Sequence, residues 1–299
     1  MNPKLSNLKQ IATLRRYTVS DGAEKGLDVI DCDNGKIRFL INVTKALDIM
    51  QLYHEGQNMS FICKNGFSPL EHDFGNRFEG GMLYTCGFDA IGGRGGYTTH
   101  GRHHNNAAEI VVAKCDEEEI VVEGIVRDTA IFGENLVLRR RISAKAGESK
   151  LTVEDTLTNE GFTPADYAVL YHINVGFPML DEGGKILGNV KSVTPRTPYA
   201  GECIDEALEI TAPEVGREEM CYYLDLDGEI ALENKKINKT FKINYSKDTL
   251  PEFLEWKAMT AGDFALGLEP STTRLDESLS FNTLEAGERK SFRIEISVK

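Results

Sequence analysis

One short segment of this chain, Tyr97 to Asn106, gathers side chains that can move protons. It holds three of the six histidines: His100, His103 and His104. An imidazole changes charge near neutral pH and also binds metals, so the segment is a candidate for proton transfer or for a metal site. The glycine-rich approach from Gly92 to Gly96 would let the backbone come close to a ligand. The alternative interpretation is a solvated polar loop.

A second candidate lies in the segment Leu170 to Pro178. If this segment is a strand, alternation places His172 and Asn174 on the face opposite Tyr171 and Ile173. One face would be apolar, and the other would carry an imidazole and an amide. A lone histidine in a strand is more often structural than catalytic, so this position depends on what lies near it.

A third candidate is Glu269, near the end of the segment Asp263 to Pro270. In a strand, Glu269 shares a face with Ala265 and Gly267, and a ligand could lie flat over such small residues. A glutamate beside apolar sequence has its pKa raised by desolvation, which suits a general base working near neutral pH. The alternative is a solvated glutamate at a strand end.

The elements that would position these side chains are strands. Two-residue alternation is cleanest in 151–158 and in 291–298, where Phe292, Ile294, Ile296 and Val298 are expected to point inward. Similar enrichment predicts further strands around residues 120–126, 136–142, 169–175, 230–232, 241–245 and 264–268. Turn signals punctuate these runs at residues 33–35, 159–161, 181–184, 227–228 and 286–288. The rhythm indicates many strands joined by hairpins.

The predicted fold class is therefore all-β, as a large antiparallel β-sandwich or a barrel. Strands do not alternate with long amphipathic helices, which disfavours a doubly wound parallel sheet. With no linker composition in the sequence, we expect one domain over residues 1–299. Residues 1–20 are expected to be an N-terminal extension or to contain a short helix near Pro3 to Leu14, and Thr44 to Met50 is ambiguous.

The formal net charge of −13 disfavours nucleic acid and anionic membranes as partners. The six cysteines are widely spaced and are interpreted as reduced thiols. Neither a signal peptide nor a run long enough to span a membrane is recognised, so a cytoplasmic location is expected.

Three motifs in order resemble those of the aldose 1-epimerases, also called galactose mutarotases. They are His100-Gly101, then Tyr171-His172 with Asn174, then the run 267–270, Gly-Leu-Glu-Pro. Supporting similarity lies in residues 153–159, 256–257 and 284–288, so the resemblance covers most of the chain after about residue 80. The run 80–87 followed by residues 100–102 is similar to an uncharacterised bacterial branch of this superfamily.

The resemblance implies a galactose mutarotase-like supersandwich that binds a sugar across a concave sheet and interconverts its anomers. It implies that His172 is the general acid on the ring oxygen and Glu269 the general base on the anomeric hydroxyl. His100 would hold the sugar near its ring oxygen, and Asn174 is also assigned to substrate binding. The chemistry needs an acid and a base together but neither a metal nor another cofactor.

The chain departs from the family in the loop around His100, where glycines replace the usual asparagine-rich segment. In extended backbone, Arg102 would share a face with His100 and His104, so we expect Arg102 and His104 to contact the substrate. A guanidinium there could bind a carboxylate, sulfonate or phosphate, so the sugar could be acidic or phosphorylated. The alternative is an Arg102 paired with a surface carboxylate.

Two other functions stay open at this stage. Histidines of the 100–104 segment, with His172 or Glu269, could hold a divalent metal in a metal-dependent enzyme. The chain could also be a carbohydrate-binding protein without turnover, or catalyse a lyase-type reaction on the same fold. Trp256, the only tryptophan, is expected in the core more than against a sugar. The oligomeric state is not predicted.

Overall fold

The strands with the clearest alternation pair with each other at the centre of the largest sheet. In this computed structural model, which describes residues 3–70, 74–275 and 280–299, β10 (Lys150–Asn159) and β20 (Arg289–Val298) run antiparallel with Val153 opposite Ile294. Phe292, Ile294, Ile296 and Val298 are all at most 2% exposed. The inward face predicted for this strand is confirmed.

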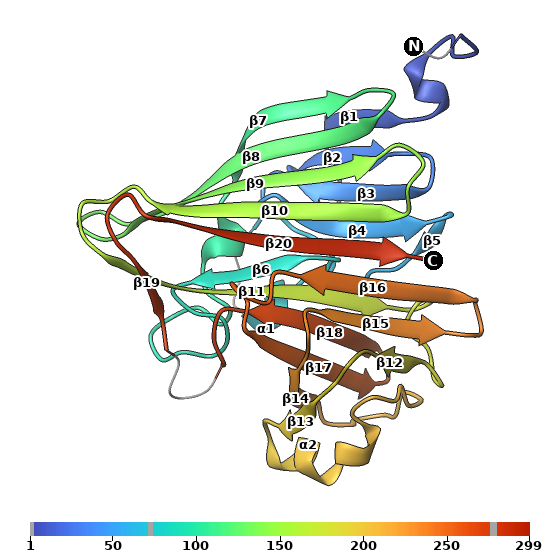
Figure 1. The fold of residues 1–299 in the computed structure, drawn as a ribbon, viewed down its shortest axis with the longest axis vertical. Helices are drawn as coiled ribbons and strands as arrows, with labels where there is room; N and C mark the ends of the chain where they lie inside the picture. Colours follow the sequence, from blue (N-terminus) through green and yellow to red (C-terminus); the bar gives the residue numbers. More distant parts are fainter. Residues whose placement is uncertain (1–2, 71–73, 276–279) are drawn as a thin grey trace.

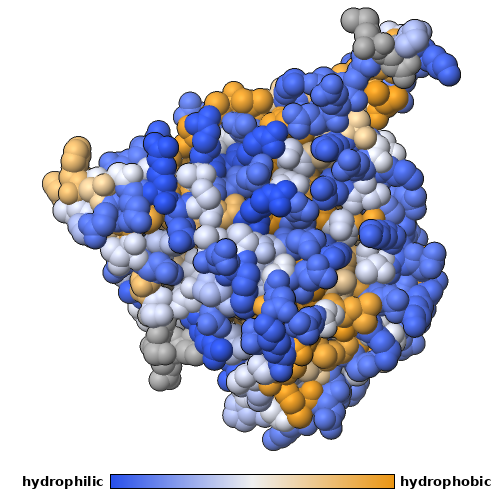
Figure 2. Space-filling view, viewed as in Figure 1, coloured by the Kyte–Doolittle hydropathy of each residue, from blue (hydrophilic) through white to orange (hydrophobic). Residues whose placement is uncertain are grey.

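Eight antiparallel strands form this sheet, in the order β12-β15-β16-β20-β10-β9-β8-β7. Its other members are β7 (Ala108–Cys115), β8 (Glu119–Thr129), β9 (Asn135–Lys145), β12 (Lys185–Leu187), β15 (Glu229–Asn234) and β16 (Lys239–Tyr245). Figure 2, in the same view as Figure 1, shows that the outward side of the molecule over these strands is largely hydrophilic. A sheet with one face in water must bury the other face against the rest of the protein. The alternation of apolar and polar residues in the sequence predicted strands of this kind.

A second sheet contains both predicted catalytic residues and runs in the order β13-β14-β17-β18-β11-β19, with β6 also paired to β11. Its strands are β6 (Tyr84–Phe88), β11 (Ala165–Gly176), β13 (Ser192–Pro195), β14 (Met220–Asp225), β17 (Glu252–Thr260), β18 (Asp263–Ser271) and β19 (Asn282–Leu284). Figure 1 shows this sheet behind the eight-stranded one.

Strands within residues 13–58 form a third sheet that the sequence patterns did not predict. It contains β1 (Thr13–Thr18), β2 (Asp28–Asp33), β3 (Ile37–Asn42), β4 (Asp48–His54) and β5 (Gln57–Asn58) in sequential order. The backbone amides of Met82 and Leu83 donate to the carbonyls of Met50 and Ile49, so this sheet is bonded to the segment that leads to β6. The ambiguous segment Thr44 to Met50 is a turn that enters β4.

Helices in the described residues are short. They are η1 (Leu8–Gln10), α1 (Phe74–Arg77), η2 (His103–Asn105), α2 (Pro198–Glu202) and η3 (Ile204–Glu206). The helix expected near Pro3 to Leu14 is only the single turn η1, capped by Asn7. No helix among the described residues is long and apolar enough to cross a membrane.

One core cluster draws on all three sheets. It includes Phe39 and Ile41 of β3, Ile142 of β9 and Ile173 of β11, which are all fully buried. The side chains of β11 and β18 that point away from this core therefore face outward from the sandwich. This outer face of the second sheet is where the candidate site lies.

Candidate active site

The register of β11 and β18 sets His172 against Glu269. Ile173 pairs with Leu268 and Leu170 with Ser271 in this antiparallel ladder, so the same register places His172 directly opposite Glu269. Tyr171 and Ile173 lie in the core while His172 and Asn174 do not, and Leu266 and Leu268 lie in the core while Glu269 does not. The faces predicted for both strands are confirmed.

The two side chains meet over a glycine. His172 Nε2 lies 3.2 Å from Glu269 Oε1, and the side chains are only 5% and 1% exposed. A Cβ on Gly267 would lie 2.1 Å from Glu269 Oε1 and 3.2 Å from His172 Cε1. The pair therefore occupies the space that any larger residue at position 267 would fill.

Burial shifts the pKa values of the pair in opposite directions. Desolvation raises the pKa of Glu269 well above its usual range, with a smaller contribution from the Glu219 charge. Desolvation lowers the pKa of His172 well below its usual range, and nearby His100 lowers it further, while the Asn174 side chain opposes the change. Both shifts disfavour charge, so burial favours a neutral His172 beside a protonated Glu269.

His100 approaches His172 from the loop after β6. The two ring centroids are 5.5 Å apart. His100 has a φ of +64° and precedes Gly101, where a Cβ would lie 2.3 Å from the Gly87 carbonyl oxygen, so this turn requires a glycine. Burial lowers the pKa of His100 to about 4, so its imidazole is neutral.

The hydrogen bond that His100 makes decides which of its nitrogens can meet a ligand. Nδ1 lies 3.0 Å from the carbonyl oxygen of Ile91. A carbonyl accepts only, so in the neutral ring Nδ1 carries the hydrogen and Nε2 carries a lone pair. His100 is therefore suited to accept a hydrogen bond from a hydroxyl group.

These residues line a cleft with a volume of about 230 Å³. Its walls come from the loops around residues 74–78 and 92–100 and from the outward face of four strands; besides the histidines and Glu269, they include Phe74, Phe78, Gly92, Thr99, Arg196, Glu219, Cys221, Leu254, Trp256 and Leu275. Drug-sized pockets measure about 300–1,000 Å³, so this cleft suits one small molecule. Its lining combines aromatic side chains with polar groups that converge on the cleft, which is typical of a binding site.

Three residues of the cleft were missed or misjudged from the sequence. Trp256 lies in the cleft rather than in the core, with its ring centroid 5.4 Å from that of His172. Its indole Nε1 donates to Glu219 Oε2 at 2.7 Å. Arg196 and Glu219 lie in segments without clear periodicity. They reach the cleft because β13 pairs with β14 and β14 pairs with β17.

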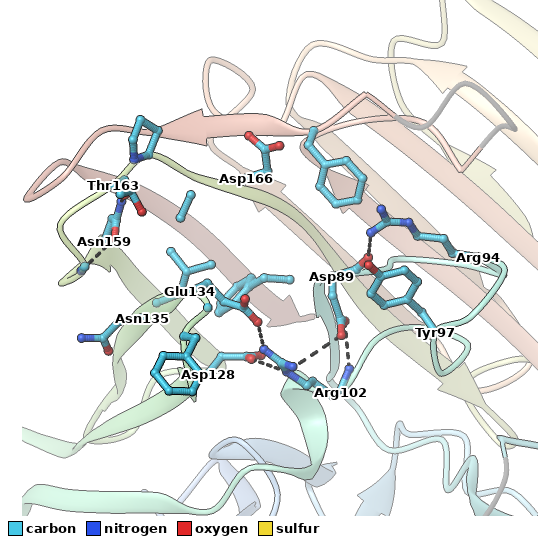
Figure 3. Close-up of a pocket in the computed structure, with 18 residues that line it drawn as sticks. Asp89, Arg94, Tyr97, Arg102, Asp128, Glu134, Asn135, Asn159, Thr163 and Asp166 are labelled. Atoms are coloured by element: carbon cyan, nitrogen blue, oxygen red, sulfur yellow. Dashed lines mark hydrogen bonds and ion pairs between the residues drawn. The ribbon is translucent and has the colours of Figure 1, made fainter. Parts of the chain in front are cut away.

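Arg102 does not reach this cleft, which corrects the expectation that it binds the substrate. Its guanidinium pairs with Asp128 at 2.6 Å and with Glu134. Figure 3 shows Arg102 among these carboxylates and Asp89 in a separate cavity of about 380 Å³. The backbone is not extended here: His100 has a positive φ and η2 follows, so residues 100 and 102 face different cavities.

His104 is also absent from the cleft, although we expected a substrate contact. Its ring stacks on Tyr84 with centroids 3.7 Å apart, and Nδ1 lies 2.7 Å from Asp48. Burial alone would lower the pKa of His104, but hydrogen bonds to Asp48 and Glu79 outweigh it and raise the pKa. His104 thus anchors the loop that carries His100.

Asn174 lies beside the pair without lining the cleft. Its Nδ2 donates to the carbonyl oxygens of Gly81 at 3.0 Å and His172 at 3.1 Å. The expected role in substrate binding becomes one of holding β11 against the segment before β6.

The three clustered histidines diverge. His100 faces the cleft, His104 meets Asp48, and buried His103 lies 3.6 Å from Asp128. Among residues 3–70, 74–275 and 280–299, no three His, Cys, Asp or Glu side chains are grouped so that they could hold a metal ion.

A family model described as "Domain of unknown function (DUF4432)" matches residues 24–298 of the chain. No curated protein matches the sequence significantly.

Solved structures share the architecture at low sequence identity. A protein from Klebsiella pneumoniae, described as a candidate aldose 1-epimerase, is 21% identical with a TM-score of 0.86, over 96% of this chain and 83% of that one. A galactose mutarotase-like protein from Clostridium acetobutylicum is 14% identical with a TM-score of 0.70, over 97% and 99%. A candidate mutarotase from Salmonella typhimurium is 11% identical with a TM-score of 0.68, over 98% and 95%. The chain has the galactose mutarotase-like fold that the motifs implied.

Proposed function

The chain belongs to the DUF4432 family and has a mutarotase-like fold, and from this premise we propose that it is an aldose 1-epimerase. The observation that carries the proposal is the 3.2 Å contact between His172 Nε2 and Glu269 Oε1 inside a cleft of about 230 Å³. Fold alone does not determine an activity, whereas a buried acid and base in contact are the groups that anomer exchange needs.

The geometry of the pair matches the two oxygens that the reaction uses. Anomer exchange removes a proton from the C1 hydroxyl and adds one to the ring oxygen, and both oxygens are bonded to C1. An acid and a base that serve them must therefore lie side by side, as His172 and Glu269 do. In this assignment Glu269 accepts the proton from the C1 hydroxyl, and His172 donates one to the ring oxygen.

The proton count of the pair stays constant through ring opening. Before opening, His172 is protonated and Glu269 is ionised; afterwards His172 is neutral and Glu269 is protonated. The second state is the one that burial favours, by lowering the pKa of His172 and raising that of Glu269. Rotation about the C1–C2 bond then presents the other carbonyl face, and the same groups return their protons. Each positioned group typically contributes about 10²–10⁴-fold.

The other cleft residues fit a sugar. His100 can accept a hydrogen bond from a sugar hydroxyl through Nε2, and Trp256 offers a ring face or edge to the apolar side of a pyranose. A carbohydrate-binding protein without turnover would use the same contacts, but it has no need of a paired acid and base.

The direct test is anomer exchange by NMR on a panel of free aldoses. We expect the wild-type protein to accelerate exchange of at least one sugar, and His172→Gln and Glu269→Gln to remove the acceleration. Both variants must be purified in parallel, because host mutarotase contamination would appear equally in all three preparations. Sugar binding without exchange in the wild type would overturn the proposal and favour the binding protein.

A further inference from the structure

Arg196 ends one row of side chains that crosses the floor of the cleft. Its backbone N–H donates to the Cys221 carbonyl at 2.9 Å, which continues the β13–β14 register in which Thr194 faces Tyr223. Cys221 in turn pairs with Trp256, and Trp256 with Gly267. The row thus runs from the glycine beneath the catalytic pair to Arg196, and the Arg196 side chain lines the same cleft.

The guanidinium of Arg196 has no carboxylate partner among the described residues. Its Nη2 donates to the Leu275 carbonyl at 3.4 Å, which is a long hydrogen bond, and the guanidinium also interacts with the neutral Cys221 thiol. Glu219, on the same cleft, accepts from the Trp256 indole instead. In a chain with 47 acidic and 34 basic residues, an arginine in a cleft that stays unpaired is notable. Arg102, by contrast, is neutralised by Asp128 and Glu134.

The place of Arg196 specifies which part of a ligand it can meet. Glu269 on β18 and Arg196 after β13 are separated by β17 and β14. Three strand spacings amount to roughly 14 Å between their backbones, and the long arginine side chain covers part of that span. Burial raises the pKa of Glu269 and lowers that of His100, and the guanidinium is near enough for its charge to act downward on both pKa values, but it starts from the far end of the row. It can therefore meet the end of a sugar that is remote from the anomeric carbon, while His172 and Glu269 serve the reacting oxygens.

We propose that the substrate is an aldose with an anionic group at the end remote from C1, and that Arg196 binds this group. A planar guanidinium presents pairs of donors that match carboxylate, sulfonate or phosphate oxygens. A cleft of about 230 Å³ restricts the substrate to a single sugar unit. The inference depends on the proposed function, since it assigns the substrate class of the same site.

The test compares three probes: glucose, glucuronic acid and glucose 6-phosphate. Anomer exchange is measured for wild type, Arg196→Gln and the control Arg15→Gln, which changes an exposed arginine on β1. We expect wild type to prefer one of the anionic sugars. Arg196→Gln should lower kcat/KM for that sugar by about 10- to 100-fold more than it lowers kcat/KM for glucose, mainly through KM. Comparison of the two anionic probes distinguishes a carboxylate site from a phosphate site.

Two results would overturn the inference: a wild type without preference for either anionic sugar, or an Arg196→Gln variant that loses glucose and anionic sugar activity equally. Failure of the proposed function gives a different pattern. In that case no sugar is exchanged, but NMR titration still detects binding of an anionic sugar, and Arg196→Gln weakens it while Arg15→Gln does not. That pattern would support the anion site without the reaction.

Discussion

At the scale of single residues, the same burial that makes His172 a poor cation makes Glu269 a poor anion. Each side chain is at most 5% exposed, and each lies within hydrogen-bond distance of the other. Solvent therefore cannot stabilise either charge, and one proton shared by the pair becomes the favourable state. The two side chains exchange the roles of acid and base in each half of the reaction, so the proton must be able to reside on either of them.

The pH dependence of activity follows from the direction of these shifts. Because the pKa of His172 is lowered, the pair takes up a second proton only at a pH below about 6.5, the usual pKa of histidine. Because the pKa of Glu269 is raised, the pair loses its last proton only at a pH above about 4.3, the usual pKa of glutamate. We expect kcat/KM to show no inflection near pH 6.5, to fall toward about pH 4, where His100 becomes charged, and to fall again at the higher pH at which the pair loses its proton. Initial rates across this range, with circular dichroism to verify folding, would check it. A midpoint near pH 6.5 would show that His172 titrates as an exposed histidine.

At the scale of elements, a strand can be predicted from its side chains but its neighbour cannot. Alternation in β11 and β18 predicted the faces of His172 and Glu269, because one face of each strand must enter the core. The pattern carries no information on which strand pairs with which. Arg196 and Glu219 were missed for this reason, since β13 and β14 place them at the cleft by pairing alone.

The loop between β6 and β7 was predicted least well. An extended backbone would place residues 100, 102 and 104 on one face, and that assumption was wrong. A positive φ at His100 and the turn of η2 direct the three side chains to the cleft, to the Asp128 cavity and to the buried Asp48. Such turns depend on tertiary contacts, here the tight approach of Gly101 to the Gly87 carbonyl.

The strand β18 also makes a sharp prediction at Gly267. A methyl group there would lie 2.1 Å from Glu269 Oε1, so Gly267→Ala must displace the carboxylate from His172. We expect kcat to fall at least about 100-fold, since misplacement by about 1 Å has costs of this order. The matched control is Gly95→Ala, whose Cβ would meet nothing within 4 Å. Anomer-exchange rates and thermal melts of both variants would check it; full activity in Gly267→Ala would contradict the geometry.

At the scale of the whole molecule, a buried ion cluster joins the three sheets. Arg140 of β9 donates to Asp155 of β10 at 2.7 and 2.9 Å, and it also binds Asp48 of β4 and Thr85 of β6. Tyr171, beside the catalytic His172, donates to Asp155 at 2.8 Å. Because Asp48 also holds His104, both histidine-bearing segments are tied to this cluster.

Neighbouring arginines test that role. Arg140 is fully buried, whereas Arg141 is 33% exposed and paired only with surface glutamates. We expect Arg140→Met to lower the free energy of unfolding by about 3–5 kcal/mol, because it leaves two buried carboxylates without their partner. Arg141→Met should change it by less than about 1 kcal/mol. Urea unfolding measures both, and equal effects would mean that the buried cluster has no special role.

The all-β class was evident from the sequence, and the five-stranded sheet at the start of the chain was not. Strands such as β3 and β4 are buried at most positions, so they lack the alternation that marks a strand with one wet face. Their place in the sandwich is set by distant contacts, such as the bonds from Met82 and Leu83 to β4.

The central claim is that His172 and Glu269 act as one unit, and a double-variant comparison of anomer exchange tests it most directly. Rates are measured for His172→Gln, Glu269→Gln and the variant with both changes, on the best sugar of the panel. If the two groups share one proton-transfer event, the double variant should be no slower than the slower single variant, because residues that act as a unit are strongly non-additive. A single variant that exchanges anomers at the wild-type rate, or a double variant whose loss is the product of the two single losses, would contradict the account.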